Sequence, residues 1–313
     1  ISELGMDVPA AGLELRKGDI SVTALDAKRF KVVGGIASGP GRLDFEGEAT
    51  TDGIVGIKLA GKQFQAANIP SANVIVEPDL TFERAPQRMM LSGSVHIPEA
   101  TIDLSKLPQS QSTQGASSDV VVIDAETQEE ERAAGIPLQA QIKVTLGEKV
   151  TLAGYGLDAR VLGQLTINEQ PGSPTIGSGE VRVEGTYKAY GQDLTIQKGQ
   201  LIYAGTPLDN PRMNIVATRE IEEVTAGLRV TGPAQSPQLT VFSEPVMGQS
   251  DALAYLVTGK PLSEVGQGDA SEGDMLQTAA RSLGTAASGV IAKSIGKRLG
   301  VDEFGVTDNE AIG

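Results

Sequence analysis

The sequence predicts an all-β fold: one elongated, curled, taco-like sheet around a groove with an apolar interior, with one or two short helices near the C-terminus. Three observations indicate this fold. Apolar and polar residues alternate through many short segments, as in strands with one buried face. Residues typical of turns separate these segments at intervals of about 8 to 12 residues, the spacing of all-β folds. Aromatic residues make up only 4% of the 313 residues and tryptophan is absent, which disfavours a thick globular core.

One seven-residue pattern occurs three times: a glycine, two apolar residues in alternation with other residues, and a second glycine. The copies are Gly41–Gly47, Gly179–Gly185 and Gly199–Gly205. Glycine tolerates conformations in which a Cβ would clash, so we expect these glycines at strand ends, where the chain turns. The alternating segments together predict about 18 strands. Stacked at ~4.8 Å, they would extend roughly 85 Å, which is too long for a compact sandwich.

The first part of the chain, residues 1–107, predicts strands joined by short turns, and we expect it to form a first segment of the groove. Residues 108–135 are polar and acidic, with too few apolar side chains to offset the cost of ordering, so we expect a mobile loop. Turn chemistry within the first part is expected at Gly34-Gly35, Gly39–Gly41, Asp52-Gly53 and Glu77–Asp79.

Residues 136–246 predict a second strand-rich segment of the groove, in which two prolines make Pro207–Pro211 a rigid turn. Residues 247–313 change to helical spacing and predict a helical C-terminal region. A short helix is expected over Ser250–Gly259, with its serine as N-cap and its glycine as C-terminal stop. An amphipathic helix is expected over residues 275–299, with basic residues in its last turns, as the helix dipole favours. Two roles are open for this helix: it packs over one end of the sheet and caps it, or it contacts a membrane or a partner barrel.

Composition excludes several classes of function. The net charge of −14 disfavours nucleic acid, whose phosphates bind basic surfaces, and also anionic lipid headgroups. The chain has no cysteine, and therefore no disulfide, zinc-thiolate site or thiol nucleophile. Its one histidine, His96, alternates with apolar Val95 and Ile97, which predicts a solvated position on the outer face of a strand. The carboxylates are dispersed along polar strand faces. The sequence therefore predicts no catalytic residue, no metal ligand, no cofactor and no enzyme.

Few predicted elements remain to cover the apolar face of such a long sheet. A large exposed apolar surface is unfavourable in water, so either the sheet folds over on itself or an apolar ligand fills the groove. An acyl chain of about fifteen methylenes costs roughly 12 kcal/mol to expose to water, at ~0.8 kcal/mol per CH₂, and a continuous groove would remove most of that cost. We therefore expect lipid acyl chains as the ligand. The residues expected to line the groove are Leu43, Phe45, Leu59, Val95, Ile142, Val144, Leu165, Ile167, Val181, Val183, Leu194, Ile196, Leu201, Tyr203 and Ile215.

Several motifs carry a resemblance to a known family. They are the block Gly185-Thr-Tyr187-Lys-Ala-Tyr190-Gly191-Gln192, the strand Gly199–Gly205, the turn Pro207–Pro211, the stretch Asp251–Gly259 and the stretch Asp119-Val-Val-Val-Ile-Asp124. With these motifs the chain resembles the TamB C-terminal domain family over nearly its whole length. The tyrosine–glycine–glutamine block is the most specific of them.

The resemblance implies a protein that is anchored in the bacterial inner membrane by an N-terminal helix and spans the periplasm. It implies the curled groove of AsmA-like, bridge-type lipid transport proteins, with roles in phospholipid movement to the outer membrane and in autotransporter assembly. It also implies a partner, TamA, which is an outer-membrane barrel. Because the chain begins at Ile1, we expect it to be part of a longer protein with the anchor upstream. Family members continue past the helical region, whereas this chain ends at Gly313, so we expect the TamA-binding end to be missing.

Three functions remain open. The first, which we favour, is a non-enzymatic lipid conduit. The second is a chaperone-like module that binds unfolded outer-membrane strands at a sheet edge by β-augmentation. The third is a surface β-solenoid that acts on carbohydrate, but this would need a repeat of constant period and a carboxylate cluster, neither of which the sequence contains. The sequence also leaves open whether the groove is continuous across residues 108–135.

Overall fold

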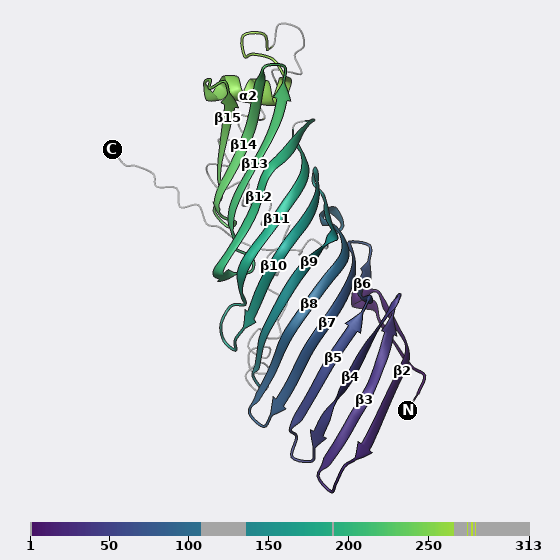
Figure 1. Ribbon diagram of the computed structural model, residues 1–313. Coiled ribbons are helices and arrows are strands. Elements are labelled where there is room, and N and C mark those ends of the chain that lie inside the picture. The colour runs from purple at the N-terminus through teal and green to yellow at the C-terminus, as the bar shows by residue number, and fades with distance from the viewer. Residues whose placement is uncertain are drawn as a thin grey trace, which may run out of the picture.

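The computed structural model describes residues 2–107, 136–189 and 191–265, together with Asp274, Gln277 and Ala279. These residues form one open sheet of 15 strands that curls along its length (Figure 1). The strands follow one another in chain order from β1 to β15, except that β6 lies off this path and pairs with β7. A short helix, α2, lies at the C-terminal end of the sheet. The predicted all-β fold, with a long curled sheet and a helix near the C-terminus, is confirmed.

Most strands are long, and β9 reaches 17 residues. In chain order the strands are β1 (Leu4–Val8), β2 (Leu13–Ala24), β3 (Arg29–Ser38), β4 (Gly41–Thr50), β5 (Val55–Lys62), β6 (Phe64–Ile69), β7 (Ala72–Ala85), β8 (Arg88–Asp103), β9 (Leu138–Gly154), β10 (Leu157–Glu169), β11 (Ile176–Ala189), β12 (Gln192–Pro207), β13 (Arg212–Ile221), β14 (Val224–Pro233) and β15 (Gln238–Glu244). Two 3₁₀ turns, η1 (Pro9–Ala11) and η2 (Leu104–Lys106), follow β1 and β8.

Some pairs of predicted short strands are single long strands in the structure. The sequence predicts two strands at Leu194–Ile196 and Leu201–Tyr203, whereas both segments lie in β12. The register between β12 and β13 shifts between Ile196 and Lys198. At such a β-bulge an extra residue interrupts the alternation without ending the strand, so the sequence pattern is broken where the strand is not. In the same way, alternation predicts separate strands at Leu13–Leu15 and Ile20–Val22, and a register shift between Arg16 and Asp19 joins them in β2.

Two of the predicted turns are wrong. Gly34-Gly35 lies inside β3, and Glu77–Asp79 lies inside β7, where the register shifts between Ile75 and Glu77. Proline occurs within sheets at bulges and edges, which explains how Pro78 is accommodated in this long strand. The remaining predicted turns are confirmed: Gly39–Gly41 connects β3 to β4, Asp52-Gly53 connects β4 to β5, and Pro207–Pro211 connects β12 to β13.

Of the six glycines of the repeated pattern, Gly41 begins β4 as predicted, whereas the other five lie inside strands and do not mark strand ends. Gly179 and Gly185 both lie inside β11, with φ of 143° and 149°. Residues with a side chain rarely adopt these angles. A Cβ on Gly185 would lie 2.2 Å from the carbonyl oxygen of Asp158 on β10. Glycine inside a strand permits a close approach of a neighbouring backbone, and here the β10 backbone approaches Gly179 and Gly185, which do not turn the chain.

The two predicted groove segments belong to one continuous sheet. β8 pairs with β9 in parallel along Met89–Asp103 and Leu138–Ala153. The other pairings among the described strands are antiparallel. Parallel neighbours need a long crossover connection. The connection from β8 to β9 includes residues 108–135, the predicted mobile loop, which lies outside the described residues.

Strand β6 crosses the ends of the first strands. Gln63, with φ of 50°, separates it from β5, and both β5 and β6 pair with β7. β6 also contacts β2, β3 and β4. The buried Ser38, at the end of β3, donates a hydrogen bond from its Oγ to the carbonyl oxygen of Gln65 at 2.8 Å. These contacts fasten the ends of the first strands to β7 through β6.

Helix α2 (Gln249–Thr258) confirms the predicted helix near residue 250, although it begins differently. Its N-cap is Gly248 instead of Ser250, and no side chain caps it. Its C-cap is Gly259, which is left-handed and donates its backbone N–H to the carbonyl oxygen of Tyr255 at 2.9 Å, as expected for a terminating glycine.

The second predicted helix, over residues 275–299, lies outside the described residues apart from Gln277 and Ala279, which are helical. Among the helices that the structure describes, none is long and apolar enough to cross a membrane.

Candidate functional site

Strand register divides the sheet into two faces, because residues paired across strands project to the same side and consecutive residues project to opposite sides. We call these the apolar face and the polar face. On the apolar face, one row of paired residues crosses eight strands: Ile20, Gly34, Phe45, Leu59, Leu80, Gly93, Ile142 and Ile167. On the polar face, the adjacent row is Asp19, Gly35, Asp44, Ala60, Asp79, Ser94, Lys143 and Thr166.

All the residues predicted to line a groove lie on the apolar face. Leu194 is fully buried and Val181 is 9% exposed, and the others are partly exposed. The structure places them as follows: Leu43 and Phe45 in β4, Leu59 in β5, Val95 in β8, Ile142 and Val144 in β9, Leu165 and Ile167 in β10, Val181 and Val183 in β11, Leu194, Ile196, Leu201 and Tyr203 in β12, and Ile215 in β13.

The sequence prediction omits other members of this face. Leu80 and Phe82 in β7 pair with Leu59 and Ile57 in β5 and lie on the apolar face. They were missed because Glu77–Asp79 resembles a turn, although Leu80 and Phe82 continue the alternation directly after it. Alternation that resumes after a proline is the signal that could have found them.

Aromatic rings lie over glycines on the apolar face. A Cβ on Gly34 would lie 2.6 Å from Cζ of Phe45, and a Cβ on Gly177 would lie 3.0 Å from Cδ1 of Tyr203. The rings therefore occupy the space that a side chain at these glycines would fill, as in the cross-strand pairing of aromatic residues with glycine. Burial raises the pKa of the Tyr203 phenol further above its ordinary value, because the apolar surroundings disfavour the phenolate.

The polar face carries ion pairs between neighbouring strands. Lys31 and Glu46 lie 2.6 Å apart and Arg160 and Glu184 lie 2.8 Å apart, with about half of each side chain exposed. The hydrogen bond from Lys31 lowers the pKa of Glu46. Because these side chains are exposed, water and salt screen the attraction between them. The ion pairs keep the polar face charged and hydrated and add little to stability.

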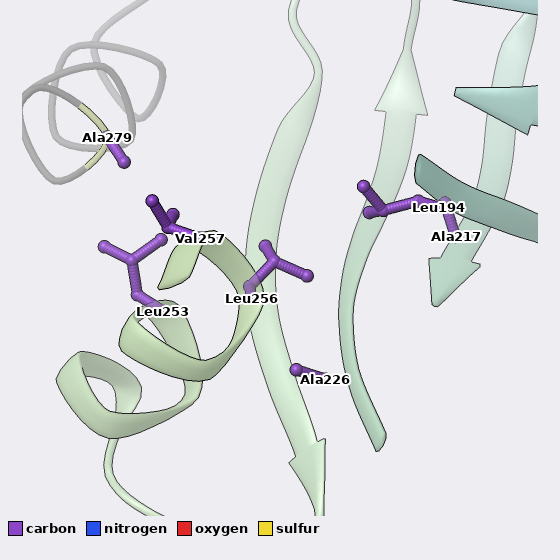
Figure 2. Close-up of a cluster of buried hydrophobic side chains, with 7 residues drawn as sticks. All are labelled: Leu194, Ala217, Ala226, Leu253, Leu256, Val257 and Ala279. Atoms are coloured by element: carbon purple, nitrogen blue, oxygen red, sulfur yellow. The ribbon is translucent and has the colours of Figure 1, made fainter. Parts of the chain in front are cut away.

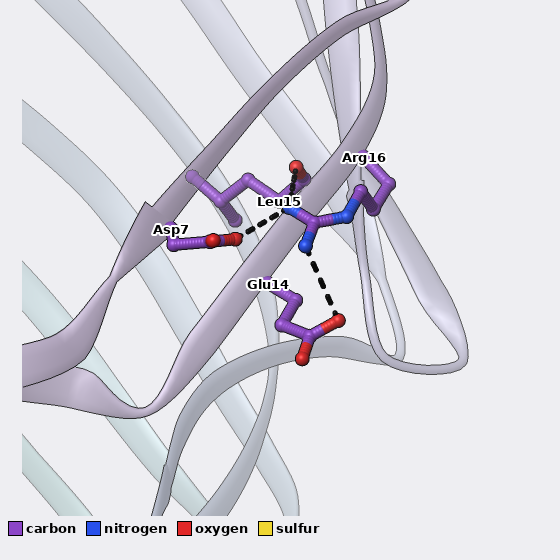
Figure 3. Close-up of polar contacts among 4 residues, drawn as sticks. All are labelled: Asp7, Glu14, Leu15 and Arg16. Atoms are coloured by element: carbon purple, nitrogen blue, oxygen red, sulfur yellow. Dashed lines mark hydrogen bonds and ion pairs between the residues drawn. The ribbon is translucent and has the colours of Figure 1, made fainter.

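The edge strand β1 is also held by such contacts (Figure 3). Arg16 on β2 donates hydrogen bonds to Asp7 on β1 at 2.5 Å, to Glu14 at 3.3 Å and to the carbonyl oxygen of Leu15 at 3.0 Å. The hydrogen bond to Asp7 raises the pKa of Arg16. Because Arg16 is 48% exposed, this cluster has the geometry of a surface ion pair and not of a reactive site.

The described residues contain no evident metal centre. No group of three or more potential metal-ligating side chains occurs among them. His96 lies on the polar face, in register with Glu77 and Thr145, as predicted from its alternation with apolar neighbours. It lines an open depression of about 610 Å³ together with polar residues such as Asn73 and Glu99. This depression is separate from the apolar face.

Helix α2 covers the apolar face at its C-terminal end (Figure 2). Leu253, Leu256 and Val257 of the helix are at most 5% exposed. They belong to one buried cluster with Leu194 of β12, Ala217 of β13, Ala226 of β14 and Ala279. The neighbouring Ile196 packs against this cluster. Leu194 and Ile196 are therefore covered by protein, whereas the other predicted lining residues lie outside the cluster.

The geometry defines an elongated, open β-sheet protein whose apolar and polar residues are segregated to opposite faces. The TamB C-terminal domain family matches residues 26–312, so the chain belongs to that family and the predicted resemblance is confirmed. The chain is 31% identical over 253 residues to the translocation and assembly module subunit TamB of Haemophilus influenzae. The alignment covers 76% of this chain and 19% of that protein, so the match spans about a fifth of the relative's length.

Proposed function

We propose that this segment is a non-enzymatic carrier of phospholipid, whose acyl chains lie along the apolar face between the inner and outer membranes of the bacterial envelope. The observation that carries the proposal is the apolar face, whose paired rows continue across eight strands and remain partly exposed. Among the described elements, β7 to β11 make their main contacts with sheet neighbours and with η2. Extended apolar surface of this kind is typical of a binding surface.

An acyl chain suits this surface because both are long, apolar and chemically uniform. Binding fifteen methylenes would recover roughly 12 kcal/mol at ~0.8 kcal/mol per CH₂. The polar face keeps the outside of the sheet hydrated through its ion pairs. The net charge of −14 repels anionic headgroups, so the affinity for phospholipid comes from the acyl chains.

Family membership supports the cellular part of the proposal. The relative is named as a subunit of a translocation and assembly module. We extend to this chain a role in outer-membrane and autotransporter assembly, with a TamA-like outer-membrane barrel as partner. The same proposal places the chain in the periplasm, as part of a longer protein anchored in the inner membrane.

A photo-crosslinking experiment tests the proposal at two adjacent positions of β9. Val144 lies on the apolar face and Lys143 lies on the polar face, so the two positions differ in face and little else. A photoreactive amino acid at Val144 in the full-length protein should capture phospholipid in cells, and the same amino acid at Lys143 should not. Absence of lipid at Val144, or equal capture at both positions, would contradict the proposal.

A charged substitution on the apolar face should interrupt lipid movement. Leu201→Arg places a guanidinium among paired apolar residues, and we expect it to block transfer of phospholipid while the sheet persists, as judged by circular dichroism. Val33→Arg is the matched control, because Val33 is 38% exposed and lies on the polar face opposite Glu46. Equal transfer by the two variants would contradict the assigned role of the apolar face.

A second candidate function rests on the edge strand β1. In the described sheet β1 pairs with β2 alone, and its apolar-face residues Leu4 and Met6 are 43% and 56% exposed. An unpaired strand edge can template an extended client by β-augmentation. This alternative predicts that a photoreactive residue at Met6 captures unfolded outer-membrane polypeptide while Val144 captures no lipid.

A further inference from the structure

The apolar face does not stay open to the end of the sheet. Its rows continue into the last strands through the paired residues Ile196, Ala217, Leu228 and Val241. There the helix α2 packs on them, and Leu256 and Val257 are 1% and 0% exposed (Figure 2). Protein side chains thus occupy the surface that acyl chains are proposed to occupy on the earlier strands.

Two strand residues fasten α2 in this position. Arg219 of β13 donates from Nη1 to the carbonyl oxygen of Leu256 at 3.2 Å, and Gln192 of β12 donates from Nε2 to the carbonyl oxygen of Val257 at 3.1 Å. The last carbonyls of a helix have no partner within the helix and lie at the negative end of its dipole. The two side chains therefore donate hydrogen bonds to carbonyl oxygens that the helix itself leaves unpaired.

The position of Arg219 is informative because it pairs with Ala226 on the apolar face. Burial lowers the pKa of its guanidinium, and no carboxylate forms an ion pair with it among the described residues. The C-terminal end of α2 is thus the partner that the structure gives to this cation. Without the helix in place, Arg219 would interrupt the apolar face.

We infer that α2 is the end stop of the lipid path: acyl chains occupy the apolar face of the earlier strands and leave it over the sheet margin before they reach the strands beneath α2. The inference rests on the proposed carrier function and adds where the path ends. Arg219 and Gln192 are the residues that hold the stop closed, and Leu228 lies in the part of the face that it closes.

Photo-crosslinking at Val144, outside the α2 cluster, and at Leu228, which is partly buried against that cluster, tests the inference in the full-length protein. We expect the photoreactive residue at Val144 to capture phospholipid and the one at Leu228 to capture at least about tenfold less. The double substitution Gln192→Ala with Arg219→Ala removes both hydrogen bonds to the helix, and should raise capture at Leu228 several-fold without change at Val144. Arg229→Ala is the matched control. Arg229 lies next to Leu228 on β14, but its side chain stacks on Phe242 on the polar face and does not hold α2.

The outcomes separate the two ideas. Equal capture at Leu228 and Val144 in the otherwise unchanged protein would overturn the end stop and leave the carrier function standing. No capture at Val144 would overturn the carrier function, and the end stop with it. Because the chain has no cysteine, a single Leu228→Cys variant gives an independent measurement. The thiol of this variant should react slowly with a maleimide, and faster when Gln192→Ala and Arg219→Ala are also present. Rapid labelling while Gln192 and Arg219 are intact would contradict the end stop.

Discussion

Substitution of Gly185 by alanine should weaken the sheet locally between β10 and β11. Its φ of 149° costs a residue with a side chain of order 1–3 kcal/mol. The added Cβ would lie 2.2 Å from the carbonyl oxygen of Asp158 and 2.7 Å from Cα of Ala159, so backbone must move. Overpacking of this kind typically costs a further 1–3 kcal/mol. We therefore expect a destabilisation of about 2–6 kcal/mol, the sum of these two costs.

The matched control is Gly56→Ala in β5. Its φ lies outside the positive region, and a Cβ there would meet nothing within 4 Å. Alanine should stabilise such a strand position by about 0.5–1 kcal/mol relative to glycine. The two substitutions therefore differ in the sign of their effect, although both exchange a strand glycine for alanine.

Hydrogen exchange of peptides from β10 and β11 measures the effect of Gly185→Ala, and urea unfolding followed by circular dichroism measures both variants. Each strand contacts mainly its neighbours, so the loss of protection should concentrate in these two strands. If Gly185→Ala unfolds at the same urea concentration as Gly56→Ala, glycine is not required for the close approach of β10 at this position.

Two further predictions concern α2 and η2. Leu256→Ala should lower the free energy of unfolding by about 2–5 kcal/mol, because Leu256 is 1% exposed. Val246→Ala is the control and should change this free energy little, because Val246 is 92% exposed. Thermal unfolding of the two variants measures the difference. Asp103 accepts hydrogen bonds from Ser105 and Lys106, which lower the pKa of Asp103 to about 2. The contribution of Asp103 to stability should therefore be complete above its unfolded pKa of about 3.9 and disappear as the pH falls toward 2. Ser105→Ala removes the largest cause of this shift and should raise the pKa of Asp103, which NMR titration measures.

The fold class follows from alternation, turn spacing and composition, and alternation assigns most members of the apolar face, although it does not extend to Leu80 and Phe82. Alternation depends on local backbone geometry, so Val144 and Leu165 were assigned to the same face before their pairing was known. Strand ends could not be predicted, because glycine and proline occur both in turns and at bends within strands. Gly34-Gly35 and Glu77–Asp79 have turn composition, but their cross-strand partners hold them in β3 and β7.

Coverage of the apolar face by α2 could not be predicted either, because it depends on tertiary packing. The sequence indicates a helix near residue 250 and an apolar strand at Leu194, but nothing in their local pattern brings them together. Their contact follows from the arrangement of β12 to β15, which places the end of the face within reach of α2. Arg219 offers a retrospective signal, since a cation at an apolar-face position needs a partner that the strand itself does not supply.

The bulges explain how one apolar face continues through strands of this length. Ile196 and Leu201 are separated by an odd number of positions, so in a regular strand they would project to opposite faces. The register shift between Ile196 and Lys198 brings both to the apolar face, where they pair with Ala217 and Met213. A register shift in β2 acts in the same way. Interrupted alternation is thus the means by which long strands keep a single apolar face, and a continuous face is what transport of an acyl chain along the sheet requires.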